Sequence, residues 1–331
     1  MDIYTQTQKL LSSMPTISDW DEMQAVIERL SSGKPPDWQL PVLGCESVGG
    51  KRENAVPAVA ATACLLISIV LVDDLLDDDP RGEYHRIGAP ATANLALAFQ
   101  AAGMEAIAQS EVSSSVKIAV IGSLNQMMLA TAFGQYKDVQ NPADEEAYWQ
   151  LIRGKSSPFF GAALHVGAFF GGAPHDIAEQ LKQFGFIYGE MIQIHDDLND
   201  AMAVPANPDW ILGRSPLPIL YAQVVEHPDR SRFLDLRKNI SNPDALSEAQ
   251  SILIHCGAVS YCVDQLLRRY QSARDILENI SLVNREGLEG LLDEVIQPVR
   301  KLLATIGVDQ PEAFLPSTDP FTQNAAIDLE K

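Results

Sequence analysis

Residues 55–79 of the chain read AVPAVAATACLLISIVLVDDLLDDD. Residues 55–72 carry no charge, whereas the last seven residues of the stretch contain five aspartates. A bilayer span needs about 20 predominantly apolar residues, and an aspartate-rich end would be costly to desolvate in lipid. A helix that is apolar on most faces is typical of the centre of a bundle. We therefore predict a buried core helix here, and no stable membrane insertion.

The rest of the sequence favours an all-α protein. Apolar residues do not alternate with period two over any long stretch, and alanine and leucine dominate the apolar positions. No break is long enough to be an interdomain linker. We expect a single large helical bundle over residues 1–308 and a flexible or loosely docked tail over residues 309–331. The predicted helices cover residues 21–31, 38–48, 55–79, 90–110, 114–138, 144–171, 175–202, 214–226, 244–278 and 287–305.

Charge and cysteine content limit the partners and the compartment. The net charge of −20 argues against nucleic-acid binding, because a phosphate backbone requires a basic face. An anionic small-molecule substrate would instead need metal ions or a few well-placed cations. The N-terminal residues lack a basic leader followed by an apolar region, and the cysteines show no CxxC spacing, so we predict a cytoplasmic protein with free thiols. The cysteines are Cys45, Cys64, Cys256 and Cys262.

Two aspartate clusters share the spacing DDxxD, which places their carboxylates on one helix face. The six positions are Asp73, Asp74, Asp77, Asp196, Asp197 and Asp200. Like charges at this spacing destabilise a helix, and oxygen ligands of this kind suit Mg²⁺. A solvated acidic helix end is the alternative, which is stronger for the first cluster because residues 184–194, before the second, are apolar and contain glycines. The pattern favours Mg²⁺ held between the two clusters.

The sequence resembles the trans-isoprenyl diphosphate synthases, or polyprenyl synthetases, over most of its length. Four motifs carry the resemblance, and they occur in the order of the family. They are Asp73-Asp74-(x)2-Asp77, Gly134-Gln135-(x)2-Asp138, Tyr148-(x)6-Lys155-Ser156, and Phe184-Gly185-(x)3-Gly189-(x)3-Gln193-Ile194-x-Asp196-Asp197-(x)2-Asp200. The resemblance implies a bundle of the isoprenoid synthase type with a central active-site cavity, in a homodimer.

The resemblance also implies a reaction. Mg²⁺ would bridge the aspartates to an allylic prenyl diphosphate and neutralise the departing diphosphate, so that an allylic cation forms. Lys155 and Arg81 would contact the substrate diphosphate, and Gln193 would orient the site near the second cluster. Arg214 stands where the family usually has a lysine, and Lys34 is the remaining cation of an N-terminal diphosphate-binding segment.

That N-terminal segment departs from the pattern of the family. Elongating members carry GKRxRP, whose cations hold isopentenyl diphosphate, whereas residues 33–41 here read GKPPDWQLP. After the first cluster, the usual pair of arginines is reduced to Arg81, with Arg86 as a second candidate. The loss of planar guanidinium donors at a diphosphate site is not a conservative change. The isopentenyl diphosphate site is therefore expected to be degenerate.

These departures leave three functions open. A prenyltransferase that couples the allylic diphosphate to isopentenyl diphosphate or another acceptor fits the intact second DDxxD. A class I terpene cyclase on the same scaffold fits the loss of acceptor cations, although the Asn/Ser/Glu metal triad usual in cyclases is missing. A non-catalytic synthase subunit ranks last, because all six aspartates are present. Ser68, Ile69 and Leu65 precede the first cluster and none is aromatic, so we expect an allylic substrate of C15 or longer.

Overall fold

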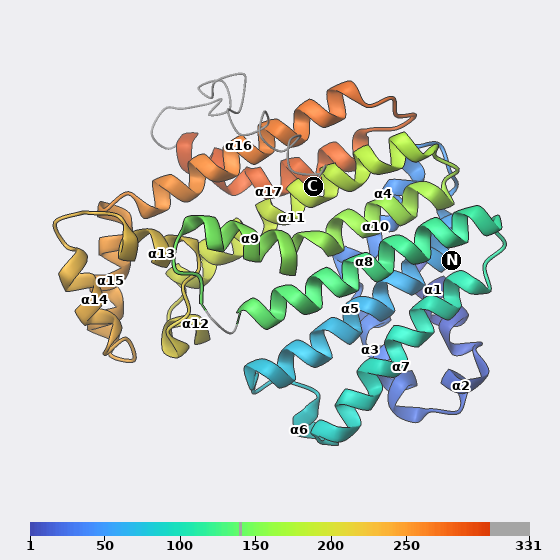
Figure 1. Cartoon of the computed structure of the whole chain (residues 1–331), viewed down its shortest axis with the longest axis horizontal. Coiled ribbons are helices and arrows are strands. Elements are labelled where there is room, and N and C mark those ends of the chain that lie inside the picture. The colour runs from blue at the N-terminus through green and yellow to red at the C-terminus, as the bar shows by residue number, and fades with distance from the viewer. Residues whose placement is uncertain (139–140, 305–331) are drawn as a thin grey trace, which may run out of the picture. The chain divides into compact units, whose positions relative to one another are not determined.

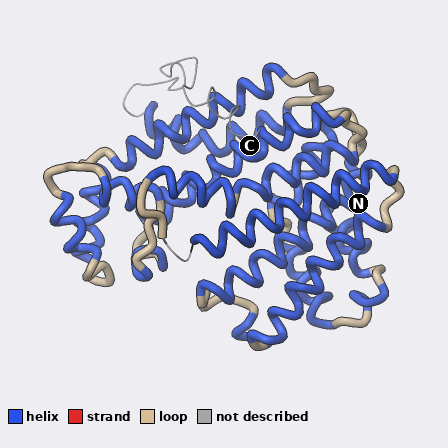
Figure 2. The backbone as a smooth tube through the Cα atoms, in the orientation of Figure 1, coloured by secondary structure: helices blue, strands red, loops and turns tan. Residues whose placement is uncertain are grey.

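The computed structural model describes residues 1–138 and 141–304, and every regular element in these ranges is a helix (Figure 2). The all-α prediction is confirmed. The predicted tail, residues 309–331, lies outside the described residues.

The described part of the chain forms long helices joined by short turns (Figure 1). In chain order the elements are α1 (Ile3–Ser12), α2 (Pro15–Ser18), α3 (Asp21–Gly33), the 3₁₀ helix η1 (Pro36–Gln39), α4 (Leu40–Ser47), the 3₁₀ helix η2 (Arg52–Ala55), α5 (Val56–Asp77), α6 (Tyr84–Ile87), α7 (Ala89–Ala108), α8 (Ser114–Asp138), α9 (Glu145–Lys155), α10 (Ser157–Phe170), α11 (His175–Met202), α12 (Pro208–Leu212), α13 (Leu217–Val224), α14 (Arg230–Arg237), α15 (Pro243–His255), α16 (Ala258–Asn279) and α17 (Glu286–Ala304).

Two of the predicted helices are each divided in the structure. The range 144–171 is interrupted at Ser156, because Pro158 stands in the first turn of α10 and disfavours helical continuation from the residues before it. The range 244–278 is interrupted at Gly257, whose φ of 90° lies in the left-handed region that glycine adopts without strain. Five short helices, α1, α2, α6, α12 and α14, were not predicted because they offer too few apolar positions to show a period.

Residue contacts divide the chain into two compact units. The first comprises Met1–Tyr136, Gly154–Gly189 and Ile280–Leu288. The second comprises Lys137–Arg153, Glu190–Asn279 and the chain from Glu289 onward. Each unit has its own buried cluster of apolar side chains. The predicted single bundle with a central cavity stays a prediction.

In the first unit, α5 is the central helix. It packs against α7, α1 and α10, and the side chains from Ala58 to Leu65 are all buried. Helix α10 also crosses α4 at very short range, where a side chain on Gly167 would collide with the carbonyl of Pro41. The prediction of a buried core helix before the first aspartate cluster is therefore confirmed.

Two helical segments are long and apolar enough to cross a membrane by length and composition alone. They are Arg52–Asp77, which includes α5, and α8. Inside the protein, 67% of the apolar window of the first is buried, but only 28% of that of α8. Burial of α5 against its neighbours accounts for its composition, whereas α8 has an apolar face that its own unit leaves uncovered.

In the second unit, α13, α14, α15 and α16 pack together. Trp210 of α12 is buried against Phe233, and its indole N–H donates to the carbonyl of Ala201 near the end of α11, at 3.0 Å. Gln250 of α15 donates to the same carbonyl and to that of Ala203. These bonds satisfy carbonyls that the end of α11 leaves without helical partners, so they fix the chain that follows the second aspartate cluster.

Candidate active site

The first aspartate cluster lies at the end of α5, in the first unit. The helix ends because Asp78 adopts a left-handed conformation, with φ of 53°. The backbone N–H groups of Asp78 and Asp79 then bond back to the carbonyl of Asp74, as in a helix C-terminal cap. Asp73, Asp74 and Asp77 therefore remain on the last helical turns, while Asp78 and Asp79 belong to the turn.

Burial and the excess negative charge at this helix end both affect the pKa of Asp74. Its pKa is raised by burial and by the neighbouring charges of Asp79 and Asp73. The cation of Lys155 lies close to the cluster: its Nζ, at the end of α9, is 3.7 Å from Oδ1 of Asp73. Gly134 of α8 makes this placement possible, because a Cβ there would come within 2.5 Å of the backbone nitrogen of Lys155. Lys155 therefore lies beside the first cluster, and its predicted contact with the substrate diphosphate stays a prediction.

The residue after Gly134 is also notable. Gln135 is buried, and its amide nitrogen has no hydrogen-bond partner in the described ranges. A buried donor without an acceptor is energetically unfavourable, and an anionic ligand oxygen would satisfy it. The sequence indicated Gln135 only as part of a motif, without a role.

Three cations that the sequence offers for diphosphate binding form ion pairs with carboxylates of the chain itself. They are Arg81, Arg86 and Lys34. Arg81 forms a two-pronged ion pair with Asp79, at 2.7 and 3.1 Å, and its side chain is 87% exposed. This pairing lowers the pKa of Asp79 to about 2. Arg86 bonds to Glu83, and Lys34 lies 3.4 Å from Asp2.

Part of the segment predicted to be a degenerate acceptor site is packed into the core of the first unit, whereas Gly33, Lys34 and Pro36 are exposed. Trp38 is 2% exposed and stacks on Tyr4 at 5.8 Å between ring centroids, and Leu40 is also buried. The neighbouring cation Lys34 points to Asp2 instead. Trp38 and Leu40 thus contribute apolar packing within the segment that the sequence predicts to be a degenerate acceptor site.

The second aspartate cluster lies on α11, in the second unit, and its centre is Asp197. This carboxylate is 5% exposed and accepts three hydrogen bonds. The hydroxyl of Tyr148 on α9 and the backbone N–H of Leu217 both donate to Oδ2 at 2.7 Å, and the amide of Gln193 donates to Oδ1 at 2.8 Å. Asp197 therefore joins α9, α11 and the start of α13.

Burial dominates the titration of Asp197. It raises the pKa of the carboxyl to about 6, against the three hydrogen bonds, which favour the ionised form. Burial also raises the pKa of Asp200. Asp196 differs from both because its side chain is 59% exposed, with His195 Nδ1 3.8 Å away.

Tyr148 is the residue at this cluster whose role the sequence did not reveal. It stands seven residues before Lys155, two helical turns along α9, and this spacing is part of a sequence motif that assigns it no role. Gln193 was predicted to orient the site, and its bond to Asp197 supports that role. Arg214 forms an ion pair with Asp209, five residues earlier in the chain, with Nη1 of the arginine 3.6 Å from Oδ1 of the aspartate.

The side chains of the site suit a magnesium diphosphate better than a metal ion alone. In the described ranges, no three histidine, cysteine, aspartate or glutamate side chains converge tightly enough to hold a metal by themselves. Mg²⁺ commonly binds through one or two carboxylates together with substrate phosphates and waters, so it needs no such cage. Within the first unit, the carboxylates of the first cluster are ligands of the kind that suits the cation, and the neighbouring ammonium group of Lys155 suits the anion.

Both aspartate clusters lie within the part of the chain that matches a known protein family. The sequence model of the polyprenyl synthetase family matches residues 25–253. The short chain isoprenyl diphosphate synthase of Methanothermobacter thermautotrophicus is 28% identical over 285 residues, which are 81% of this chain and 87% of that protein.

Solved structures show the same fold at low identity. The geranylgeranyl pyrophosphate synthetase of Pyrococcus horikoshii superposes with a TM-score of 0.76 at 21% identity, covering 89% of this chain and 98% of that one. The polyprenyl synthase of Caulobacter crescentus, complexed with calcium and isoprenyl diphosphate, gives 0.75 at 19% identity, covering 89% and 93%. With the family match spanning more than half of its residues, this chain belongs to the polyprenyl synthetase family.

Proposed function

We propose that the protein is a magnesium-dependent prenyltransferase that ionises an allylic prenyl diphosphate and couples it to isopentenyl diphosphate or another acceptor. The observation that carries the proposal is the position of Lys155, a cation 3.7 Å from the first aspartate cluster in a member of the polyprenyl synthetase family. In a chain of net charge −20, a cation retained beside an acidic cluster is suited to an anionic substrate.

Each side chain has a defined part in this proposal. The aspartates of the two clusters are the proposed Mg²⁺ ligands, and Mg²⁺ bound by them would neutralise charge on the diphosphate leaving group. Lys155 would contact a diphosphate oxygen, and its charge would stabilise the negative charge that develops on departure. Gln193 and Tyr148 act through Asp197, which they hold by hydrogen bonds. The role of Asp197 as a metal ligand stays a prediction, because both of its oxygens already accept bonds from the chain.

Arg81, Arg86, Arg214 and Lys34 require a change of partner to reach a substrate. Arg81 is the best placed of the four, because its pair with Asp79 is exposed and lies directly after the first cluster. An exposed pair of this kind contributes on the order of 0–1 kcal/mol, so exchange of the carboxylate for a phosphate costs little.

One observation favours a second candidate, a class I terpene cyclase. Trp38 and Leu40 fill the core where elongating relatives carry acceptor-binding cations, and Lys34 pairs with Asp2. Without those cations to hold an acceptor diphosphate, the allylic cation would react with a double bond of the same prenyl chain.

Product analysis separates the two candidates. Purified protein with Mg²⁺ is incubated with farnesyl or geranylgeranyl diphosphate, each with and without isopentenyl diphosphate. A longer diphosphate formed only with isopentenyl diphosphate supports prenyl transfer to that acceptor. Hydrocarbon or alcohol products without it would instead support the cyclase. Substrates that stay intact in both arms would leave the non-catalytic subunit as the better account.

We propose an allylic substrate of C15 or longer. Ser68 and Leu65 are buried on α5, one to two turns before the first cluster, and neither is aromatic. Small and aliphatic side chains at this depth leave more room for a prenyl chain than an aromatic ring would. Comparing turnover of geranyl, farnesyl and geranylgeranyl diphosphates checks the preference.

We also propose a homodimer and a cytoplasmic location. Ile118, Leu129, Phe133 and Tyr136 are exposed along one face of α8, and such a face is expected to be covered by a partner. Light scattering on the wild type and on L129D tests the dimer, since a charge at a buried interface disfavours association. The four free cysteines suit a reducing compartment, and cell fractionation tests that location.

A further inference from the structure

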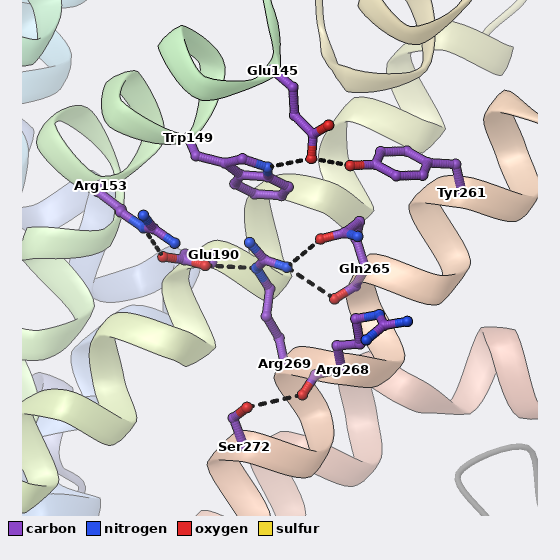
Figure 3. Close-up of polar contacts among 9 residues, drawn as sticks. All are labelled: Glu145, Trp149, Arg153, Glu190, Tyr261, Gln265, Arg268, Arg269 and Ser272. Carbon is purple, nitrogen blue, oxygen red and sulfur yellow. Dashed lines mark hydrogen bonds and ion pairs between the residues drawn. The ribbon is translucent and has the colours of Figure 1, made fainter. Parts of the chain in front are cut away.

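A polar network in the second unit has no part in the proposed reaction. It lies between α9, α11 and α16, and its centre is Glu190 (Figure 3). The two carboxylate oxygens of Glu190 are shared between two arginines. Oε1 accepts from Nε of Arg153 on α9 at 2.9 Å, and Oε2 accepts from Nε of Arg269 on α16 at 2.6 Å. One carboxylate thus connects three helices.

The arginine on α16 is held on every side. Its side chain and that of Glu190 are each only 11% exposed. A terminal nitrogen of Arg269 donates to the side chain and the backbone carbonyl of Gln265, one turn earlier (Figure 3). Its guanidinium carbon lies 3.7 Å from the centroid of the Trp149 ring. A guanidinium that is hydrogen-bonded to Glu190 and Gln265 and also stacks on an aromatic face has little freedom to reorient.

Trp149 is fixed in turn from the other side. Its indole N–H donates to Glu145 at 3.0 Å, and the same carboxylate oxygen accepts from the hydroxyl of Tyr261 on α16 (Figure 3). Trp149 also packs edge-on against Tyr148, with ring centroids 4.8 Å apart. Tyr148 is the residue that donates to Asp197. The network therefore reaches the second aspartate cluster through adjacent residues of α9.

The position of Glu190 on α11 leads to the same cluster. Glu190 precedes Gln193 by three residues and Asp197 by seven, so the three side chains share one face of the helix. Two connections then join α9 to that face. The first is the ion pair of Arg153 with Glu190, and the second is the hydrogen bond of Tyr148 with Asp197, seven residues further along α11. Two connections two turns apart fix both the spacing and the rotation of the helix pair.

We propose that Glu190 and Arg269 are positioning residues for the second aspartate cluster. They hold α9 and α16 against α11, so that Tyr148 and Gln193 keep the carboxylate of Asp197 in place. The inference rests on the proposed function, since what the cluster is positioned for is a magnesium diphosphate. Arg153 contributes less, because its side chain is 55% exposed and solvent screens its charge.

The test measures binding of Mg²⁺ without turnover. Thermal melting is followed while Mg²⁺ is titrated in the presence of inorganic diphosphate, for wild type, E190Q, R269M and the double variant. Loss of a residue that orients a ligand set lowers metal affinity by roughly 10-fold or more. E190Q and R269M are therefore each expected to need roughly 10-fold more Mg²⁺ for half of the melting shift. The double variant should need less than the product of the two factors, because the pair acts as one unit.

Arg268 supplies a matched control from the next position of α16. Its ion pair with Asp264 of the same helix, at 2.8 Å, lies outside the network, so R268M removes an arginine while the contacts of Arg269 with Glu190, Gln265 and Trp149 remain. R268M should keep the Mg²⁺ requirement of the wild type. Should R269M fail to fold, R269K keeps the charge but loses the forked contacts, and a raised Mg²⁺ requirement is expected there too.

The outcomes separate this inference from the proposed function. Variants that melt at lower temperature but respond at the Mg²⁺ concentration of the wild type would show that the network only stabilises the fold, and would overturn the inference alone. A wild-type protein whose melting does not respond to Mg²⁺ and diphosphate overturns the proposed function and this inference with it.

Discussion

Replacing Tyr148 by phenylalanine removes one hydroxyl and leaves the ring in place. That hydroxyl is one of three donors to the buried carboxylate of Asp197, at 2.7 Å. A hydrogen bond to a charged group contributes about 1.5–3 kcal/mol to stability. At roughly 2–4 °C for each kcal/mol, which is typical of units of this size, the melting temperature should fall by about 3–12 °C. Because Asp197 supports its cluster, the rate of diphosphate release should fall roughly 10-fold.

Tyr4 provides the matched control for the Tyr148 variant. Its hydroxyl donates to the neutral carbonyl of Pro35 at 3.1 Å, so Y4F should lose only about 0.5–1.5 kcal/mol. Differential scanning calorimetry gives the two melting shifts, and release of diphosphate from an allylic substrate gives the rates. Equal melting shifts for Y148F and Y4F, with the activity of Y148F unchanged, would refute the view that Asp197 depends on Tyr148.

Three further predictions concern the first unit. K155Q should lower kcat roughly 100-fold, because it removes a cation that would stabilise the leaving group; unchanged kcat in steady-state assays would exclude that role. S68F should shorten the products or accepted substrates, read by chromatography of the prenyl chains, whereas V70F, at an exposed site of the same helix, should not change them. Burial lowers the pKa of His165 to about 4. The unfolded chain then binds more protons between about pH 6.5 and 4, so stability should fall by up to about 3 kcal/mol as the pH drops through this range. Denaturant unfolding should show a smaller fall for H165Q, and an equal fall would contradict the assignment.

The all-α class and the long helices could be predicted from local pattern. Residues 55–77 combine an uncharged, mostly apolar run with a charged end, and this contrast is a property of the sequence alone. Boundaries were predicted well where a helix ends in a strong local signal, such as the aspartates after α5. They failed within 144–171 and 244–278, because a continuous apolar pattern does not show the short turns at Ser156 and Gly257.

Spacing alone predicted both aspartate clusters, since DDxxD places carboxylates on one face of any helix. Sequence could not distinguish the three carboxylates of the second cluster from one another. Asp196 is exposed, whereas Asp197 is buried under three donors, and two of those donors come from other helices. Burial and hydrogen-bond partners depend on which segments fold together, so they appear only in the tertiary structure.

The three cations near the aspartate clusters and the N-terminal segment show most clearly what the sequence determines and what only the tertiary structure decides. The sequence determined that Lys34, Arg81 and Lys155 are available near the predicted diphosphate motifs. Only the folded chain decided that Lys155 lies beside Asp73, while Arg81 and Lys34 pair with carboxylates of their own surroundings. The physical reason is that a charge interacts strongly only over a few ångströms, and the tertiary structure sets these distances between residues that are far apart in the sequence.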